Sequence, residues 1–376
     1  VSNGNIIDLQ APNGVKSKPS VSDDGSSVVF IGADDNMYSI TFDWAQGQYN
    51  FGLLDDQNAW RNVVISKDGN RLAALLDSEE PYIYVFDLLS QTNESFKLYN
   101  PTTGSGGIFT DNVDYADAME FDHTGEYLMY DALSSLFFAG TEYWDIAFIN
   151  VWNNSSKNYG NGEIEKLFTS LPDGVSVGNP VFSKNSPNII AFDYIEDGTP
   201  EINQLWGANI ETGNIGVIYE NNTLAYPCFS KDDKYVIFNS INNGEEVIGV
   251  QQLTSSKINP TGSASLLIGD SYWGAWFGTG ERVINSNFGL KVLKDKINVY
   301  PNPAKNEITL NWSTKNNFSG IIKVLDIKGN VLTTKSIELK EGENSESIRL
   351  DNLPAGAYFI EAQRGQLKKT VKFMKN

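Results

Sequence analysis

Short apolar runs separated by polar turns recur along almost the whole chain, and no long stretch has helical periodicity. A block of apolar-x-Ser-x-Asp-Gly followed by a second apolar run recurs between residues 19 and 285. Each block predicts two antiparallel strands joined by a turn whose Gly, Asp or Asn supplies a positive φ. The copies are Pro19–Ile31, Val63–Leu76, Met119–Asp131, Pro180–Asp193, Pro227–Asn239 and the degenerate Trp273–Asn285.

The spacing of these blocks predicts the architecture. The turn positions Gly25, Gly69, Gly125, Pro187, Asp233 and Gly280 are 44, 56, 62, 46 and 47 residues apart. That is the period of a four-stranded propeller blade. One hairpin buries little core, whereas six packed radially bury both faces of every sheet. We therefore expect an all-β chain with a six-bladed β-propeller over residues 1–290, closed by Asn5–Pro12 as an outer strand of the last blade.

The blocks resemble the repeats of the TolB-like (WD40-like) β-propeller family, which read Pro-x-Phe-Ser-x-Asp-Gly before an apolar strand. The resemblance covers roughly residues 5–290. It is closest at Val181–Ser183 and Cys228–Ser230, and it implies the same propeller fold.

A second domain follows a short charged linker at residues 291–296. Two prolines in Tyr300–Pro303 remove donors from a strand ladder, so this segment predicts a rigid turn that opens the domain. Alternating strands separated by turns such as Lys328–Asn330 then fill residues 297–376. Seven short strands in about eighty residues predict an immunoglobulin-like β-sandwich.

The same segment closely resembles the type A C-terminal sorting domain of the Bacteroidota type IX secretion system. The matching landmarks are Val299–Leu310, Val324–Leu332, Leu350–Ala362 and the basic end of the chain. An Fn3-like or carbohydrate-binding module is the alternative, but it does not explain these landmarks together. The sorting-signal residues that the resemblance implies are Tyr300, Pro301, Asn302, Pro303, Gly329, Leu353, Pro354, Gly356, Tyr358, Lys368, Lys369 and Lys372.

The resemblance also implies partners and a destination. The protein is expected to cross the outer membrane through the type IX secretion translocon, with a PorV-type shuttle barrel receiving residues 297–376. It is then secreted or held at the cell surface, usually after cleavage of the sorting domain. The chain begins at Val1, so we expect either a removed signal peptide or a longer precursor.

Charge excludes some partners. Residues 297–376 carry 12 Lys and Arg against 8 Asp and Glu, a net charge of +4. Because the whole chain has a net charge of −19, the remaining residues have a net charge of −23. A surface this acidic repels phosphates, so nucleic acid and anionic membranes are not expected partners of the propeller. The single cysteine, Cys228, lies in an apolar strand context and is expected to be a buried, inert thiol.

Candidate catalytic and metal-binding residues are few. The one histidine, His123, occupies a predicted turn and is expected to be a solvated surface residue. The acidic segments Asp111–Asp117 and Asp23–Asp24 offer oxygen ligands for Ca²⁺, but they lack EF-hand spacing, and plain acidic loops are favoured. No nucleophile elbow is present, since Gly269–Trp273 lacks its second glycine. We therefore assign no catalytic residue and expect no cofactor other than this candidate Ca²⁺.

Recognition is the remaining function class. Insertions beyond the minimal blade, Gln91–Tyr115, Leu133–Tyr143 and Asn153–Val177, favour a surface for a protein or glycan ligand, or else their aromatics cap blade cores. We expect a non-catalytic binding propeller. The alternatives are the propeller of a secreted hydrolase (a peptidase or glycosidase) whose catalytic part lies upstream or is unrecognised, and a structural part of the surface machinery. The aromatics are Tyr99, Phe109, Phe137, Phe138 and Tyr159.

Overall fold

A computed structural model provides the structure of the chain. It describes residues 9, 11, 14–101, 112–135, 142–168, 171–277, 282, 284, 290, 297–314, 317–326, 330–364 and 367–376. Regular structure in these residues consists almost entirely of β-strands, as the apolar pattern predicts. Among them, no helix is long and apolar enough to cross a membrane.

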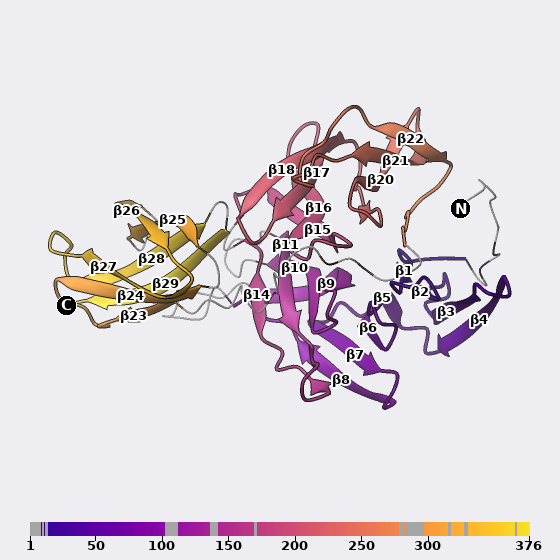
Figure 1. Ribbon diagram of the computed structural model, residues 1–376, viewed down its shortest axis with the longest axis horizontal. Helices are drawn as coiled ribbons and strands as arrows, with labels where there is room; N and C mark the ends of the chain where they lie inside the picture. Colours follow the sequence, from indigo (N-terminus) through magenta and orange to yellow (C-terminus); the bar gives the residue numbers. More distant parts are fainter. Residues whose placement is uncertain are drawn as a thin grey trace.

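Five antiparallel four-stranded sheets follow one another between residues 20 and 269 (Figure 1). Blade 1 contains β1 (Ser20–Val21), β2 (Ser27–Ile31), β3 (Met37–Asp43) and β4 (Gln48–Asp55). Blade 2 contains β5 (Trp60–Ile65), β6 (Arg71–Leu76), β7 (Tyr82–Asp87) and β8 (Thr92–Lys97). Blade 3 contains β9 (Asn112–Phe121), β10 (Tyr127–Ser135), β11 (Glu142–Asn150) and β14 (Ile164–Lys166), with a small hairpin of β12 (Trp152–Asn153) and β13 (Asn158–Tyr159).

Two further sheets complete this part of the chain. Blade 4 contains β15 (Val175–Phe182), β16 (Ile189–Glu196), β17 (Ile202–Asn209) and β18 (Asn214–Asn221). Blade 5 contains β19 (Cys228–Phe229), β20 (Tyr235–Asn242), β21 (Glu245–Gln252) and β22 (Ser265–Gly269). The first strand of each sheet contacts the first strand of the next around a common centre, which is the arrangement of a β-propeller. We call this centre the hub.

The repeated Ser-x-Asp-Gly sequence forms the turn after the first strand of a blade. In blade 2 the Ser66 hydroxyl donates to Asp68 at 2.6 Å and accepts the backbone N–H of Arg71 at 2.9 Å. Gly69 in the same turn has φ 74°. Blades 1 and 5 repeat these bonds through Ser22 and Ser230. The predicted positive-φ turn is therefore confirmed, and the repeat is a local hydrogen-bonding unit.

The sixth copy of the repeat forms no strand within residues 271–277, 282 and 284, and its other positions lie outside the described residues. Its described part nevertheless runs from blade 5 to blade 1. The Phe277 ring stacks on Trp44 at 5.7 Å, and the Arg282 guanidinium pairs with the Asp23 carboxylate. Most of the predicted closing strand Asn5–Pro12 also lies outside the described residues. Of that segment, Leu9 and Ala11 pack against the apolar face of blade 1.

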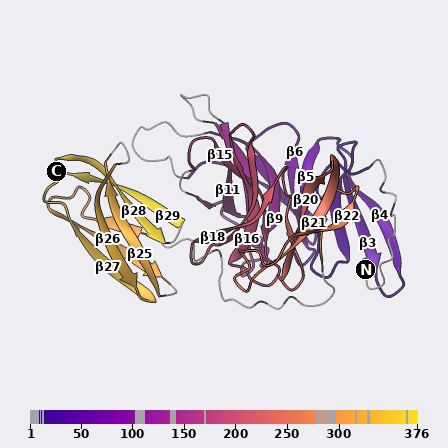
Figure 2. The ribbon, with the colours of Figure 1, turned by 90° about the horizontal axis from the view of Figure 1, so that it is seen from above.

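Seven strands form a separate group at the C-terminal end (gold in Figure 2). Their two sheets share one apolar core that includes Ile308, Trp312, Ile360 and Phe373. The first sheet has the order β23 (Ile297–Tyr300), β24 (Glu307–Thr314), β27 (Gly342–Arg349). The second has the order β26 (Val331–Leu339), β25 (Phe318–Leu325), β28 (Gly356–Arg364), β29 (Leu367–Lys375).

Candidate functional site

The first strands of blades 2, 3 and 4 each carry a β-bulge at the hub. In blade 2, Trp60 pairs with Leu76 and Asn62 with Leu75, which leaves Arg61 as the extra residue. Bulges bend a strand and redirect side chains, and they are common beside functional sites. The corresponding extra residues are Asp117 and Ala118 in blade 3, and Asn179 and Pro180 in blade 4.

Three residues at this level of the hub have left-handed backbone conformations that are uncommon for residues other than glycine. The φ angles are 50° for Asn179, 43° for Tyr226 and 55° for Trp273. A bulky residue held at positive φ costs free energy, which the surrounding structure must offset. The hub therefore holds two bulky aromatic residues, Tyr226 and Trp273, in strained conformations, while positive φ elsewhere includes turn residues such as Asp35 and Asn243.

Hydrogen bonds from the preceding blade hold these strained residues. An Asp131 oxygen accepts the N–H of Asn179 at 2.7 Å, and an Asp193 oxygen accepts that of Tyr226 at 3.3 Å. Each donor is thereby fixed by a side chain on the second strand of the blade before it. Asn239 does the same for the N–H of Trp273 at 3.1 Å. We call Asp131, Asp193 and Asn239 the hub acceptors.

Both acidic hub acceptors are fully buried. Burial, with a smaller contribution from the neighbouring Asp117 charge, raises the pKa of Asp131 to about 7. Burial also raises the pKa of Asp193 to about 6. Backbone N–H donors oppose both shifts because they favour the ionised form. The two carboxyls remain partly protonated at pH values where an exposed aspartate is fully ionised.

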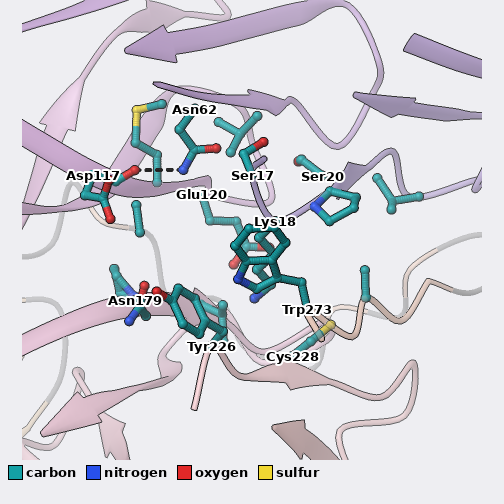
Figure 3. A pocket seen from close by; sticks show the side chains of 18 of the residues that line it. Ser17, Lys18, Ser20, Asn62, Asp117, Glu120, Asn179, Tyr226, Cys228 and Trp273 are labelled. Atoms are coloured by element: carbon teal, nitrogen blue, oxygen red, sulfur yellow. Dashed lines mark hydrogen bonds between the residues drawn. The ribbon is translucent and has the colours of Figure 1, made fainter. Parts of the chain in front are cut away.

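The bulged residues surround a cavity of about 370 Å³ at the hub. It is lined by the first strands of all five blades and by the segment from Trp273 to Trp276. Figure 3 shows Lys18, Glu120, Tyr226 and Trp273 converging on this space, with Asn62 bonded to the carbonyl of Asp117. A cavity of this size lies in the usual range for small-ligand sites.

Four charged side chains, one from each of blades 1 to 4, gather inside this hub cavity. The Lys67 ammonium is bonded to Glu120, and the Lys184 ammonium lies 4.0 Å from the same carboxylate. The Lys18 ammonium donates to the carbonyl of Pro227 at 2.5 Å. We call Lys18, Lys67, Lys184 and Glu120 the lysine cluster. It carries three positive charges and one negative charge when all its groups are ionised.

Burial and charge shift the pKa values in this cluster in opposite directions. Burial of Glu120 opposes its ionisation, but the ammonium groups of Lys67 and Lys184 lower its pKa to about 2. Burial lowers the pKa of Lys18 and of Lys67, although Glu120 partly offsets this effect. The cluster therefore keeps an ionised carboxylate at Glu120.

Arginine and aspartate line another part of the hub cavity. The Arg61 guanidinium lies 3.5 Å from an oxygen of Asp77 and 3.8 Å from one of Asp117, and it stacks on Tyr115 at 4.3 Å. The Lys16 ammonium donates to Asp35 at 2.5 Å. Arg61 and Lys16 therefore each have an ion-pair partner within this part of the cavity wall.

Of the candidates that the sequence suggested for catalysis and metal binding, Asp117 lines the hub cavity, whereas His123 and Asp24 lie elsewhere. His123 occupies the predicted turn after β9, but its side chain is only 20 % exposed and burial lowers its pKa, so it is not the solvated residue we expected. Asp24 accepts bonds from Ser22 and Ser26 and serves the turn. Asp111 lies outside the described residues. Within the described part of the chain, no three His, Cys, Asp or Glu residues are placed to bind a metal.

The insertion aromatics are divided. Tyr159 packs against the core between blades 2 and 3 and meets Trp152 edge-on at 5.4 Å, so it caps a blade core. Tyr99 remains 46 % exposed, and its hydroxyl accepts the N–H of Ile164 at 3.3 Å. Phe109, Phe137 and Phe138 lie outside the described residues. Cys228 is buried, as its apolar context predicts.

The opening turn of the C-terminal segment contacts the last strand. Asn302 Oδ1 accepts the N–H of Met374 at 2.9 Å, and Ala304 exchanges backbone hydrogen bonds with Met374 and Asn376. The neighbouring Tyr300, Pro301 and Pro303 are exposed. Asn302 is therefore the residue of this motif that joins the start of the domain to the end of the chain.

The second sorting motif forms a tyrosine corner. The Tyr358 hydroxyl donates to the carbonyl of Pro354 at 2.8 Å, and the Tyr358 ring stacks on Phe373 at 5.7 Å. Leu353 packs against the core, and Gly356 begins β28. Gly329 lies outside the described residues, and Lys368, Lys369 and Lys372 fall on β29, where their side chains lie outside the described part.

The sequence analysis did not identify the hub. Its signal was the Asp or Asn that closes the repeated block, as in Asp131, Asp193 and Asn239. An aspartate or asparagine directly after an apolar strand is unusual in a protein core, because burying a polar group costs free energy unless it is hydrogen-bonded. Its recurrence there indicates a specific hydrogen-bonding role.

Comparison with known proteins separates the two parts of the chain. Residues 298–376 match the family of secretion system C-terminal sorting domains. No curated protein matches the sequence.

Solved structures similar to the chain include two TolB proteins, as the repeats predicted. TolB from Acinetobacter baumannii has 14 % identity and a TM-score of 0.48, over 69 % of this chain. The match spans only 56 % of that protein's length. Putative TolB from Agrobacterium tumefaciens has 14 % identity over 80 % of this chain and 94 % of its own, with a TM-score of 0.38.

An oligogalacturonate lyase from Vibrio parahaemolyticus is also similar, with 12 % identity over 71 % of this chain and 81 % of its own and a TM-score of 0.38. The region ahead of the sorting domain is a β-propeller, since its five four-stranded sheets are arranged around the hub. Residues 298–376 are a sorting domain of the type IX secretion system, and the protein is exported across the outer membrane to be secreted or held at the cell surface.

Proposed function

We propose that this exported propeller is a non-catalytic binding module whose ligand occupies the hub cavity. The observation that carries the proposal is the convergence of strained backbone, bulges and buried charge on one space lined by all five sheets. Strained residues persist where the surrounding structure enforces them, and they concentrate at binding and catalytic sites.

The protonation states around the cavity favour binding over hydrolysis. A general acid needs a pKa near the working pH. Glu120 has a pKa of about 2 and stays ionised between two lysines. Asp131 has a suitable pKa, but both its oxygens accept backbone hydrogen bonds behind the bulge.

A binding array tests the site. The full chain is probed on glycan and peptide arrays beside Ala118→Phe and Ala275→Phe, which place a ring in the cavity from two different segments. We expect the wild-type signals to be lost in both variants. Ala45→Phe, in the exposed turn between β3 and β4, is the matched control. Signals that survive both cavity-filling changes contradict the proposal.

The alternative function is the propeller of a secreted hydrolase. It is favoured by Asp131, a carboxyl beside the cavity whose pKa of about 7 suits a general acid. Incubating array-positive compounds with the full chain and analysing products by mass spectrometry separates the two. Turnover that disappears in Asp131→Asn supports a hydrolase, whereas intact compounds support a binding module.

Two finer features of the architecture belong to this proposal. The contacts of Phe277 and Arg282 with blade 1 support a sixth blade that closes the ring. The tyrosine corner of Tyr358 and the orders of the two sheets support an immunoglobulin-like domain in which β26 pairs with β25. We also propose that this domain binds a PorV-type shuttle protein, which co-purification with the full chain tests.

A further inference from the structure

We infer that the hub cavity takes a small carboxylated sugar whose acid group is bound by the ammonium groups of Lys18 and Lys184. This inference rests on the proposed function and adds the chemical class of the ligand. It follows from the charge inside the hub cavity and from the side chains that form its walls.

The charge inside the lysine cluster is not balanced by the protein. Lys67 has Glu120 as a direct partner, and the second oxygen of Glu120 accepts the N–H of Phe182 at 2.6 Å. Among the described residues, the nearest carboxylate to Lys184 is at 4.0 Å, and none lies within 4 Å of the Lys18 ammonium. The ammonium groups of Lys18 and Lys184 therefore have N–H donors that remain available to an anionic ligand.

Buried ammonium groups are costly unless they are paired. Lys67 is buried, while Lys18 and Lys184 are partly buried where they face the hub cavity. The remainder of the chain outside residues 297–376 has a net charge of −23, so carboxylates are abundant on the propeller. Only one of them lies within the cluster. An anionic ligand supplies the missing negative charge.

The walls of the cavity fit a sugar. Tyr226 and Trp273 meet edge-on at 6.2 Å and both line the cavity. Asn62, Asn179 and Ser17 add amide and hydroxyl groups to the same lining. Aromatic side chains offer an apolar face beside a polar group, and amides and hydroxyls bond alcohols in both directions.

A phosphate fits these residues less well. Phosphate sites favour bidentate arginine or a row of backbone N–H groups. The arginine that lines this cavity, Arg61, is already flanked by Asp77 and Asp117. Lysine ammonium groups act as point charges without the two-pronged geometry of arginine, so they can also bind a single carboxylate.

Calorimetry on the full chain tests the inference. The probes are uronic-acid disaccharides and the methyl esters of the same compounds, which differ only in charge. We expect a uronic acid to bind at least tenfold more tightly than its ester. Lys18→Met and Lys184→Met should each weaken the acid about tenfold and leave the ester unchanged, because each removes one charge-assisted hydrogen bond.

Glu120→Gln provides a change in the opposite direction. It keeps an acceptor for Phe182 but removes the competing negative charge, so the acid should bind more tightly. Lys234→Met, at an exposed lysine paired with Asp232, is the matched control and should change nothing. Circular dichroism and melting temperature verify that each variant is folded before binding is measured.

Equal binding of acid and ester, or an unchanged affinity in both lysine variants, overturns the inference. Tighter binding of inorganic phosphate or of a tripeptide with a free C-terminus also overturns it, in favour of those anions. In each of these cases the proposed function still stands if Ala118→Phe abolishes the binding observed. Binding that persists in Ala118→Phe rejects the hub itself.

Discussion

Asn302 and Met374 are 72 positions apart in the sequence, yet the Asn302 side chain accepts the Met374 backbone N–H at 2.9 Å. The bond fixes the terminal strand β29 at the turn that opens the domain. It gives a physical reason for an Asn between two prolines in the sorting motif, since an amide oxygen there reaches a donor that the sheet leaves unpaired.

Asn302→Ala should weaken the attachment of β29. Loss of one hydrogen bond costs about 1 kcal/mol, so hydrogen exchange at the end of β29 should become roughly fivefold faster. Mass spectrometry of the C-terminal peptide measures this rate. Asn352→Ala, in an exposed turn, is the control. Equal exchange in Asn302→Ala and wild type contradicts a clamp.

Tyr358→Phe should destabilise the sorting domain while leaving its packing intact. The ring keeps its stack on Phe373, but the bond to the Pro354 carbonyl is lost. We expect a loss of about 1 kcal/mol, measured as faster hydrogen exchange in β28. Tyr300→Phe, which changes an exposed tyrosine, should have no effect. A similar change in both variants means that the corner does not stabilise the domain.

Arg282→Met should weaken the junction between the two ends of the propeller. Arg282 Nε lies 2.6 Å from an Asp23 oxygen, and a second nitrogen of the same guanidinium bonds the other oxygen. A partly exposed bidentate pair contributes about 1.5 kcal/mol. Thermal unfolding of the full chain should show a lower melting temperature for the propeller.

The controls for Arg282→Met are one matched and one reciprocal variant. Arg349→Met removes an exposed arginine of the sorting domain and should leave propeller melting unchanged. Asp23→Asn should reproduce the Arg282→Met effect. If only one of the two partners matters, the pair is not the source of the stability.

Asp131→Asn should change how stability depends on pH. The raised pKa of Asp131, about 7 against 3.8, means that the folded state favours the protonated carboxyl. Its contribution is therefore fully present below about pH 4 and is lost as the pH rises through about 7. Asparagine does not titrate. The free energy of unfolding of wild type minus that of the variant should fall across this window.

Urea unfolding of both proteins at several pH values from 4 to 8 measures that difference. Asn50→Ala, at an exposed position of strand β4, changes no titratable group and is the control, so its difference should be flat. A difference that stays constant or rises between pH 5 and 7 shows that the Asp131 carboxyl ionises normally in the folded protein.

Local chemistry made the strands and turns predictable. The Ser66, Asp68 and Gly69 turn needs contacts only within six residues, so its repeat in the sequence predicts each hairpin. The seven C-terminal strands follow from alternation and turn signals in the same way. Strand positions could therefore be predicted without knowledge of the tertiary structure.

The hub could not be predicted in this way. Asp131 bonds Asn179 from 48 positions away, and Asp193 bonds Tyr226 from 33 positions away. Neither pair has a fixed spacing that a sequence pattern reveals. The lysine cluster likewise combines residues from four blades, so its charge becomes visible only when the blades are placed around the centre.

The hub acceptors also define what one repeat unit is. Asp193 belongs to blade 4, but it accepts the N–H groups of Ala225 and Tyr226, which lead into the first strand of blade 5. A single sheet therefore does not contain all the side chains that shape its part of the cavity wall. The transferable module runs from the second strand of one sheet to the bulge of the next. A graft or duplication cut at sheet boundaries would separate Asn179 from Asp131 and Tyr226 from Asp193, whereas one cut in the hairpin turns would keep both pairs.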